Sequence, residues 1–205
     1  MNADQVLQIL QVCEKLKCTT RHCDSSTGRR ESVAEHCWQM SLMAMLLEHR
    51  FRAEFPEADM HKVLQMCLIH DLGEAFTGDI PSFEKSGQDE AAEEALLLKW
   101  VSSFPQPERS QWEALYAEMT AQESIEAKIY KAMDKMEAVI QHNLSDIASW
   151  LPLEYALQRS YGQEEVRFSR CTQELKEAVD RMTEQKIARA KERPLSDGDT
   201  PHTAR

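Results

Sequence analysis

Two histidines and two aspartates have the types and spacings to bind one divalent metal ion together. His36 is followed by the adjacent pair His70 and Asp71, and Asp134 comes later in the chain. Imidazole nitrogens and carboxylate oxygens form mixed ligand sets for divalent transition ions, with positions left for water or a phosphate oxygen. Such an ion lowers the pKa of a bound water from about 16 to roughly 7–9, which makes it a nucleophile near neutral pH. The four residues therefore indicate a hydrolytic metal site.

The first of these ligands lies near the start of a predicted helix. Ser32 and Glu35 have the S-x-x-E spacing of a capping box, which predicts a helix over about 32–50. His36 then lies in the first turns of this helix. The apolar side chains that we expect to pack inward from it are Val33, Met40, Met43 and Leu47.

The other three ligands lie in two more predicted helices. His70 and Asp71 close the apolar segment 58–72. Asp134 lies in the periodic segment from 123 to about 148, and an aspartate within an apolar stripe costs free energy unless it is paired or bound to a metal ion. The apolar positions that define the two stripes are Val63, Leu64, Cys67, Leu68, Ile129, Met133, Met136 and Ile140.

Glu74 is the candidate general acid or base. If helical geometry continues past Gly73, Glu74 shares a face with His70 and Asp71, because residues three and four positions apart are neighbours on a helix. A third carboxylate beside a metal-bound water is where proton transfer is needed. The alternative interpretation of Glu74 is a solvated helix residue.

Three segments resemble the HD-domain metal-dependent phosphohydrolases and, within them, the small 5′-deoxynucleotidases. The segments are ESVAEH, HDLGEAFTGD and AKIYKAMDKMEAVIQ, and the similarity runs from about Leu16 to about Ile140. The resemblance implies an all-α fold in which a single-domain helical bundle covers residues 1–191, with an HD core at about 30–140. It also implies that the metal ligands are His36, His70, Asp71 and Asp134.

The same resemblance assigns roles to four residues around the metal site. It implies that Glu74 is the catalytic carboxylate and that Asp79 helps to hold the substrate sugar or to order the site. Arg21 falls where the family places an arginine that contacts phosphate. His22 stands where the family commonly has Trp, so we expect looser discrimination between deoxyribose and ribose. From the residues alone, Asp79 is also explained as a turn cap and Arg21 as a solvated loop charge.

These features predict a metal-dependent phosphomonoesterase that hydrolyses (deoxy)nucleoside 5′-monophosphates to a nucleoside and inorganic phosphate. One complete ligand set predicts one divalent ion per chain, and the resemblance implies cobalt, manganese or a similar ion and a homodimer. Two alternatives remain open: an HD-type hydrolase of another nucleotide (a phosphodiester or a nucleoside polyphosphate), and a catalytically silent helical interaction protein. A di-iron HD oxygenase is disfavoured, because residues 72–133 contain no histidine that could supply additional ligands.

The composition favours one helical domain. The chain has 205 residues, 42% of them hydrophobic, which suffices for a sizeable core. Few glycines and prolines, ten methionines and no stretch of alternating apolar residues favour helices over strands. A net charge of −11 argues against binding to a nucleic-acid polymer, whose phosphates would be repelled. A small phosphate monoester can still bind where a metal ion and an arginine reverse the charge locally.

The sequence indicates neither a membrane protein nor a secreted one. No apolar run approaches the roughly 18 residues that span a bilayer, and the start MNADQVLQIL lacks the basic region and cleavage site of a signal peptide. The six cysteines form no C-x-x-C pair, and several fall at buried-looking positions, as reduced thiols do. We therefore expect a cytoplasmic protein.

Outside the site, the sequence predicts further helices and two loops of functional interest. Loop 18–31 carries Arg21, and loop 77–88 is placed to cover the site. Segment 192–205 has the composition of a disordered tail. The remaining helices are expected at 3–17, at 89–103, from Pro107 to about 119, and at 163–191. The histidines interpreted as ordinary core or surface residues are His49, His61, His142 and His202.

Overall fold

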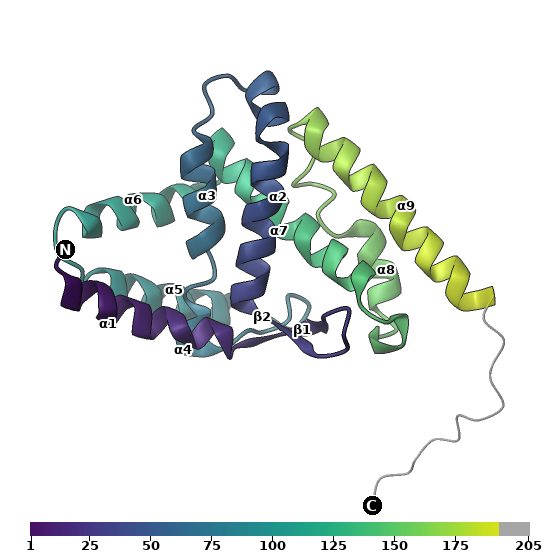
Figure 1. Ribbon diagram of the computed structural model, residues 1–205, viewed down its shortest axis with the longest axis horizontal. Helices are drawn as coiled ribbons and strands as arrows, with labels where there is room; N and C mark the ends of the chain where they lie inside the picture. Colours follow the sequence, from purple (N-terminus) through teal and green to yellow (C-terminus); the bar gives the residue numbers. More distant parts are fainter. Residues whose placement is uncertain (193–205) are drawn as a thin grey trace, which may run out of the picture.

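Three helices pack against one another at the centre of the computed structural model, which describes residues 1–192 (Figure 1). They are α2 (Val33–Glu54), α3 (Met60–Ile69) and α7 (Ile125–Leu144). These are the three helices that the sequence predicts to carry the metal ligands. The all-α, single-domain fold expected from the composition and the resemblance is confirmed.

The other helices flank this centre on two sides (Figure 1). On one side, α5 (Gly87–Val101) packs against α4 (Glu74–Thr77) and α6 (Glu108–Ala121), with α1 (Ala3–Cys13) beside them. On the other side, α9 (Arg170–Glu192) packs against α7 and α2, and α8 (Glu154–Ser160) packs against α9. Two short 3₁₀ helices, η1 (Glu14–Lys17) and η2 (Ile147–Ser149), join their neighbours.

Side-chain caps begin the three central helices. Ser32 and Glu35 form the predicted capping box at the start of α2, each accepting a hydrogen bond from the other's backbone N–H. Asp59 caps α3 by accepting from two backbone N–H groups, and Ser124 caps α7 by accepting from one. These caps satisfy donors that the first helical turn leaves unpaired.

The core lies between α2, α3 and α7. Each side chain that is fully buried there contributes about 1.5–3 kcal/mol through removal of apolar surface from water. Met66 of α3 is fully buried, whereas Leu68, which was predicted to face inward, is 54% exposed. The core side chains with no exposed surface include Val33, Met40, Phe51, Val63, Met66, Cys67, Ile129, Met133 and Met136.

The predicted loop 18–31 is instead a hairpin of two antiparallel strands, β1 (Thr20–Asp24) and β2 (Arg30–Ser32). The turn contains Gly28, whose φ of +80° suits a residue without a side chain. The prediction was wrong because the strands show no apolar alternation. Their buried positions include Glu31 and Ser32, which are polar. The hairpin lies against α7 and so presents Arg21 to that helix.

The C-terminal third also differs from the prediction. The sequence indicated one helix at 163–191, whereas α9 begins at Arg170 and α8 precedes it as a separate short helix. Of the predicted tail 192–205, Glu192 ends α9, and residues 193–205 lie outside the described part of the chain. Among residues 1–192, no helix combines the length and apolar character needed to traverse a bilayer.

Candidate functional site

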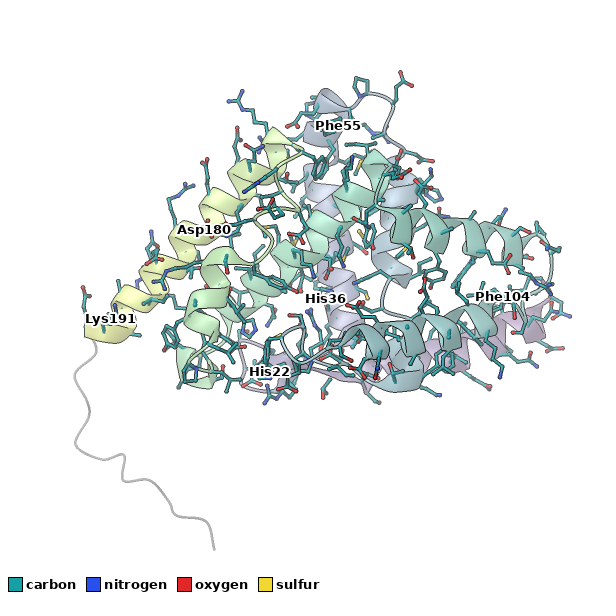
Figure 2. All side chains as sticks on the ribbon, turned by 180° about the vertical axis from the view of Figure 1, so that it is seen from behind. His22, His36, Phe55, Phe104, Asp180 and Lys191 are labelled. Carbon is teal, nitrogen blue, oxygen red and sulfur yellow. The ribbon has the colours of Figure 1, made fainter. Side chains whose placement is uncertain are left out.

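The structure brings the four predicted metal ligands together. His36 comes from the first turns of α2, near the middle of the molecule (Figure 2). Its Nε2 lies 3.3 Å from His70 Nε2, at the end of α3, and 3.7 Å from Oδ2 of the following residue, Asp71. Asp134 projects from α7, and its Oδ1 lies 3.5 Å from His36 Nε2 and 3.9 Å from His70 Nε2.

These separations fit one divalent metal ion. Metal–ligand bonds of about 2.0–2.2 Å place neighbouring ligand atoms roughly 3–3.5 Å apart and opposite ones roughly 4 Å apart. The observed distances span this range, the shortest being 3.0 Å between His70 Nε2 and Asp71 Oδ2. The side chain of His36 is 0% exposed and that of His70 is 5% exposed, so bulk water barely reaches their nitrogens. Two imidazoles and two carboxylates that converge in this way form a suitable donor set.

The second nitrogen of each imidazole is held by another acceptor. His36 Nδ1 contacts a carboxylate oxygen of Glu137, and His70 Nδ1 lies 3.1 Å from the carbonyl oxygen of Cys67. A proton on each Nδ1 donates in these contacts, which leaves Nε2 as the metal-binding atom and fixes the ring orientation. The chain therefore supplies an outer layer of support for both histidines.

Two lysines on α7 lie beside one carboxylate oxygen of Asp134. Lys131 Nζ lies 2.9 Å and Lys135 Nζ lies 3.7 Å from Asp134 Oδ2. Burial alone would raise the pKa of Asp134, but the attraction of Lys131 and then Lys135 holds that pKa well below its usual range. Asp134 is consequently a carboxylate, with Oδ1 directed at the two imidazoles.

Glu74 reaches the site from a different backbone geometry than predicted. Residues 70–73 form a turn rather than a continuation of α3, and Glu74 begins α4. The residue is only 5% exposed, and its Oε2 has no hydrogen-bond partner. Burial, followed by the nearby charges of Asp71 and Asp79, raises the pKa of Glu74 to about 10. Without a cation beside it, Glu74 therefore keeps a proton at neutral pH.

The segment between α4 and α5 forms one wall of a cavity beside these ligands. Asp79, Phe83 and Lys85 line this cavity, as expected of a loop predicted to cover the site. Burial raises the pKa of Asp79, while the charge of Arg21 opposes this shift and the charge of Asp71 adds to it. Lys85 Nζ lies 2.7 Å from Glu93 Oε2, which ties this loop to α5.

Arg21 lies in the same cavity wall, on β1. Its Nη1 is 2.9 Å from Oε2 of Glu137 and 3.4 Å from Oε2 of Glu31. Glu137 is the same carboxylate that contacts His36. Burial, together with the charge of Glu137, raises the pKa of Glu31 to about 7. The arginine is therefore embedded in an acidic pair, and its position beside the metal ligands is set by α7.

His22 belongs to a second polar cluster in the cavity wall. Its Nε2 lies 3.0 Å from Oε1 of Glu154 at the start of α8, and its ring packs edge-on against Phe83. His142 approaches the same Glu154 oxygen at 3.3 Å. His142, which the sequence analysis interprets as an ordinary core or surface histidine, also lines the cavity.

The cavity has a volume of about 220 Å³. Acidic and basic groups from the hairpin, α4, the following loop and α7 surround the part near the metal ligands. Aromatic, apolar and amide side chains of α7 and α8 complete the wall. Its lining includes Arg21, His22, Asp71, Glu74, Asp79, Phe83, Lys85, Lys131, Asp134, Lys135, Val139, His142, Glu154, Leu157, Gln158 and Tyr161.

Glu137, Glu154 and the lysines beside Asp134 were not among the residues predicted from the sequence to form the site. Glu137 had a detectable signal, because it follows Asp134 by one helical turn within the same apolar stripe and is fully buried. Glu154 had none, since it opens a short helix that the periodicity did not indicate. Lys131 and Lys135 had the i−3 and i+1 spacing to Asp134, which is common on solvated helices.

A family model described as HD domain matches residues 13–176 of the chain. The chain is similar to the 5′-deoxynucleotidase HDDC2 of Homo sapiens, with 27% identity over 143 residues, which cover 68% of this chain and 67% of the human protein. It is also similar to the 5′-deoxynucleotidase HDDC2 of Dictyostelium discoideum, with 28% identity over 141 residues, which cover 66% of this chain and 74% of that protein.

Solved structures share the fold. A protein of Magnetospirillum magnetotacticum MS-1 described as a predicted metal-dependent phosphohydrolase superposes with a TM-score of 0.73 at 23% identity, covering 92% of this chain and 93% of that one. A conserved hypothetical protein of Pyrococcus furiosus gives a TM-score of 0.62 at 26% identity, covering 88% of this chain and 99% of that one. The arrangement of helices around the site is therefore shared with other proteins.

Proposed function

The chain belongs to the HD domain family and is a metal-dependent hydrolase, and we propose that it hydrolyses (deoxy)nucleoside 5′-monophosphates to a nucleoside and inorganic phosphate. The observation that carries the proposal is the convergence of two imidazoles and two carboxylates beside a cavity that also contains cationic side chains. The relatives named 5′-deoxynucleotidase support a nucleotide as the substrate.

We propose one divalent ion per chain. The residues that would hold it are His36, His70, Asp71 and Asp134. When bound, such an ion lowers the pKa of water and offsets the charge of phosphate oxygens. Cobalt, manganese and zinc all accept nitrogen and oxygen ligands, so the donor set does not choose among them.

The cations of the cavity would bind the phosphate group. Arg21, Lys131 and Lys135 line the cavity next to the ligands and bring local positive charge to a chain of net charge −11. Both carboxylate contacts of Arg21 use Nη1, and within residues 1–192 its Nε and Nη2 make no hydrogen bond that would compete. An arginine with two free donors can contact a phosphate in bidentate fashion.

Glu74 would carry the proton that the reaction needs. Water attacks the phosphorus atom in line, and the bond from phosphorus to the 5′-oxygen of the sugar breaks. Burial favours the protonated form of Glu74, which can donate to that departing oxygen, and once ionised the carboxylate can orient the next water. Asp79, in the adjacent wall, would hold the sugar or keep the Glu74 side chain in place. This route requires no phosphorylated side chain.

We also propose a homodimer. Helix α2 carries a row of apolar side chains on the face away from the core, with exposed fractions of 62% for Trp38, 57% for Met45 and 74% for Leu46. Contiguous exposed apolar surface of this kind commonly marks an interface between proteins. A second copy of the chain would cover it.

A cytoplasmic location remains part of the proposal. The six cysteines all lie within the described residues and are all free, and four of them are buried. Buried free thiols suit a reducing compartment.

A screen of phosphate release tests the proposed function. Purified protein is incubated with each deoxyribo- and ribonucleoside 5′-monophosphate and with Co²⁺, Mn²⁺, Mg²⁺ or Zn²⁺ in turn. We expect release from monophosphates, and loss of release in His70→Ala. Nucleoside triphosphates and a cyclic nucleotide are included as substrates for the two other HD-type hydrolase activities, and their products are separated by chromatography, because hydrolysis of a phosphodiester frees no inorganic phosphate. Turnover of these substrates alone would replace the proposal, and turnover of none would leave a non-catalytic helical protein.

A further inference from the structure

Besides Oε2 of Glu74, three buried polar atoms without a hydrogen-bond partner belong to residues of the same cavity wall. They are Oε1 of Glu154, Nδ1 of His142 and Oε1 of Gln158. Glu154 is 2% exposed and Gln158 is 3% exposed, so water offers little compensation. Buried polar groups in folded proteins are normally paired, and several unpaired ones in a cavity wall indicate a ligand that completes them.

Within the described part of the chain, only one of the two carboxylate oxygens of Glu154 accepts a hydrogen bond. Its Oε2 accepts a hydrogen bond of 2.6 Å from the backbone N–H of Leu151. Its Oε1 lies 3.0 Å from His22 Nε2 and 3.3 Å from His142 Nε2, but neither contact is aligned as a hydrogen bond. The oxygen is therefore oriented by two imidazoles while it remains able to accept a hydrogen bond from a ligand.

The surrounding groups are mostly acceptors. Burial lowers the pKa of His142, although the charge of Glu154 opposes this, so the imidazole is neutral and offers an acceptor nitrogen. The side-chain oxygen of Gln158 adds a further acceptor. A ligand that complements these atoms must supply hydrogen-bond donors.

The cluster lies next to the proposed phosphate site. His22 directly follows Arg21 on β1, so their Cα atoms are about 3.8 Å apart. His142 follows Asp134 on α7 by two helical turns, or about 12 Å along the axis. The group attached directly to the phosphate of a nucleoside monophosphate is the sugar, and it would therefore lie beside His22 and Glu154.

We propose that Glu154, supported by His22 and His142, forms a subsite that accepts hydrogen bonds from the hydroxyl groups of ribose. The protein would then bind and hydrolyse ribonucleoside monophosphates at least as well as their 2′-deoxy counterparts. A carboxylate is a suitable partner for a ribose hydroxyl, because a charged acceptor strengthens the hydrogen bond. Phe83, edge-on to the His22 ring at 5.4 Å between centroids, would close the subsite from the loop side. This inference rests on the proposed nucleotidase function.

Binding of nucleosides tests the subsite without catalysis. Calorimetry of the full metal-loaded chain would compare adenosine, 2′-deoxyadenosine, 3′-deoxyadenosine and adenine. We expect adenosine to bind roughly 10- to 150-fold more tightly than 2′-deoxyadenosine, the range for a hydrogen bond to a charged group. Equal affinities would overturn the proposal. Adenine that binds as tightly as adenosine would also overturn it, because the donor would then be the amino group of the base.

Two variants locate the effect. Glu154→Gln keeps an oxygen for the Leu151 N–H but replaces the free acceptor by an amide, and we expect the preference for adenosine to fall below about twofold. His22→Phe keeps the packing against Phe83, removes the imidazole beside Glu154 and should also reduce the preference. His22→Phe tests the subsite by itself if Glu154→Gln has too low a melting temperature for binding to be measured. Glu174→Gln, which changes a surface carboxylate on α9, is the matched control and should retain the wild-type preference. A preference that survives in both cavity variants would contradict the proposal.

Kinetics separate this inference from the function on which it rests. The ratio of kcat/KM for AMP to that for dAMP should fall in Glu154→Gln by the same factor as the binding ratio. Failure to release phosphate from either substrate, with intact adenosine preference in binding, would reject the nucleotidase function and keep the subsite. Release from dAMP without any effect of Glu154→Gln on the ratio would reject the subsite and keep the function.

Discussion

One carboxylate oxygen of Glu137 joins Arg21 to His36. Its Oε2 lies 2.9 Å from Arg21 Nη1 and also contacts His36 Nδ1. Glu137 has no exposed surface, so both contacts are made away from water. A single side chain of α7 therefore orients a proposed metal ligand and the proposed phosphate-binding arginine.

The first prediction is that Glu137→Gln weakens metal binding about 10- to 100-fold. The amide removes the charge that holds the His36 ring and turns a donor toward Arg21 or His36. Calorimetric titration with Mn²⁺ measures the change. Glu184→Gln, which alters an exposed partner of Arg159, should bind as the wild type does. An unchanged affinity in Glu137→Gln would show that His36 is oriented without it.

The second prediction is that purified protein holds about one metal equivalent per chain and that Asp134→Ala holds none. Removal of the carboxylate takes away one ligand and leaves the charge of Lys131 and Lys135 facing the cation site. Elemental analysis measures the content, with Asp180→Ala on α9 as the control. A chelator should abolish phosphate release, and an added divalent ion should restore it. Two equivalents in the wild type, or metal retained by Asp134→Ala, would contradict the single four-residue site.

The third prediction is that Glu74→Gln lowers kcat roughly 10²- to 10⁴-fold, the usual contribution of a general acid or base. The amide has the shape of the protonated carboxyl but cannot transfer its proton. Metal content should stay near the wild-type value, because Glu74 is not one of the four proposed metal ligands. Retention of more than about a tenth of kcat would remove Glu74 from the proton-transfer role.

The fourth prediction concerns assembly. We expect light scattering to give about twice the chain mass of 23.6 kDa at micromolar concentration. Leu46→Glu places a charge in the exposed apolar row of α2 and should yield monomers. Leu68→Glu changes an equally large apolar side chain, 54% exposed on α3, and should leave the dimer intact. A wild type that is monomeric throughout this range would refute the dimer.

The fifth prediction is a pH dependence of stability that originates at His142. Burial, the largest influence, lowers its pKa below the usual 6.5, so the unfolded chain binds a proton there more readily than the folded one does. Above pH 6.5, His142 is neutral in both states, and its titration does not change the free energy of unfolding. As the pH falls below 6.5, the unfolded chain takes up a proton there first, which lowers the free energy of unfolding. Urea denaturation at pH 7.5 and 5.5 should show a smaller loss in His142→Gln than in the wild type. His61→Gln, at an exposed position, should match the wild type.

The candidate ligands could be named from the sequence, because the choice depends on residue type and helical periodicity. His36, His70, Asp71 and Asp134 interrupt or end apolar stripes, and an ionisable group in such a place needs a partner whatever the fold. The capping box at Ser32 likewise depends on near neighbours in the chain. Local rules of this kind predicted the three central helices and the four candidate ligands that the structure brings together.

The partners of these ligands depended on the tertiary structure. Glu137 is 101 residues from His36 and 116 from Arg21, and no local rule relates them. The same holds for His22 and Glu154, which meet because a hairpin and a short helix end at the same cavity. Neither element has the apolar periodicity that predicts strands or helices. Each is stabilised by packing against α7 or α9, which a local pattern does not reveal.

The sequence by itself determined which groups can bind a metal ion, because ligand chemistry belongs to the side chain and helix formation to its near neighbours. Only the tertiary structure decided which carboxylates are ionised, which are left unpaired, and which face the cavity. Those properties depend on burial and on charges that distant segments bring within a few ångströms. Glu74 and Glu154 are both glutamates at the start of a helix, yet burial and neighbouring acidic charges raise the pKa of Glu74, whereas Glu154 has one oxygen bound to the Leu151 N–H and the other beside two imidazoles.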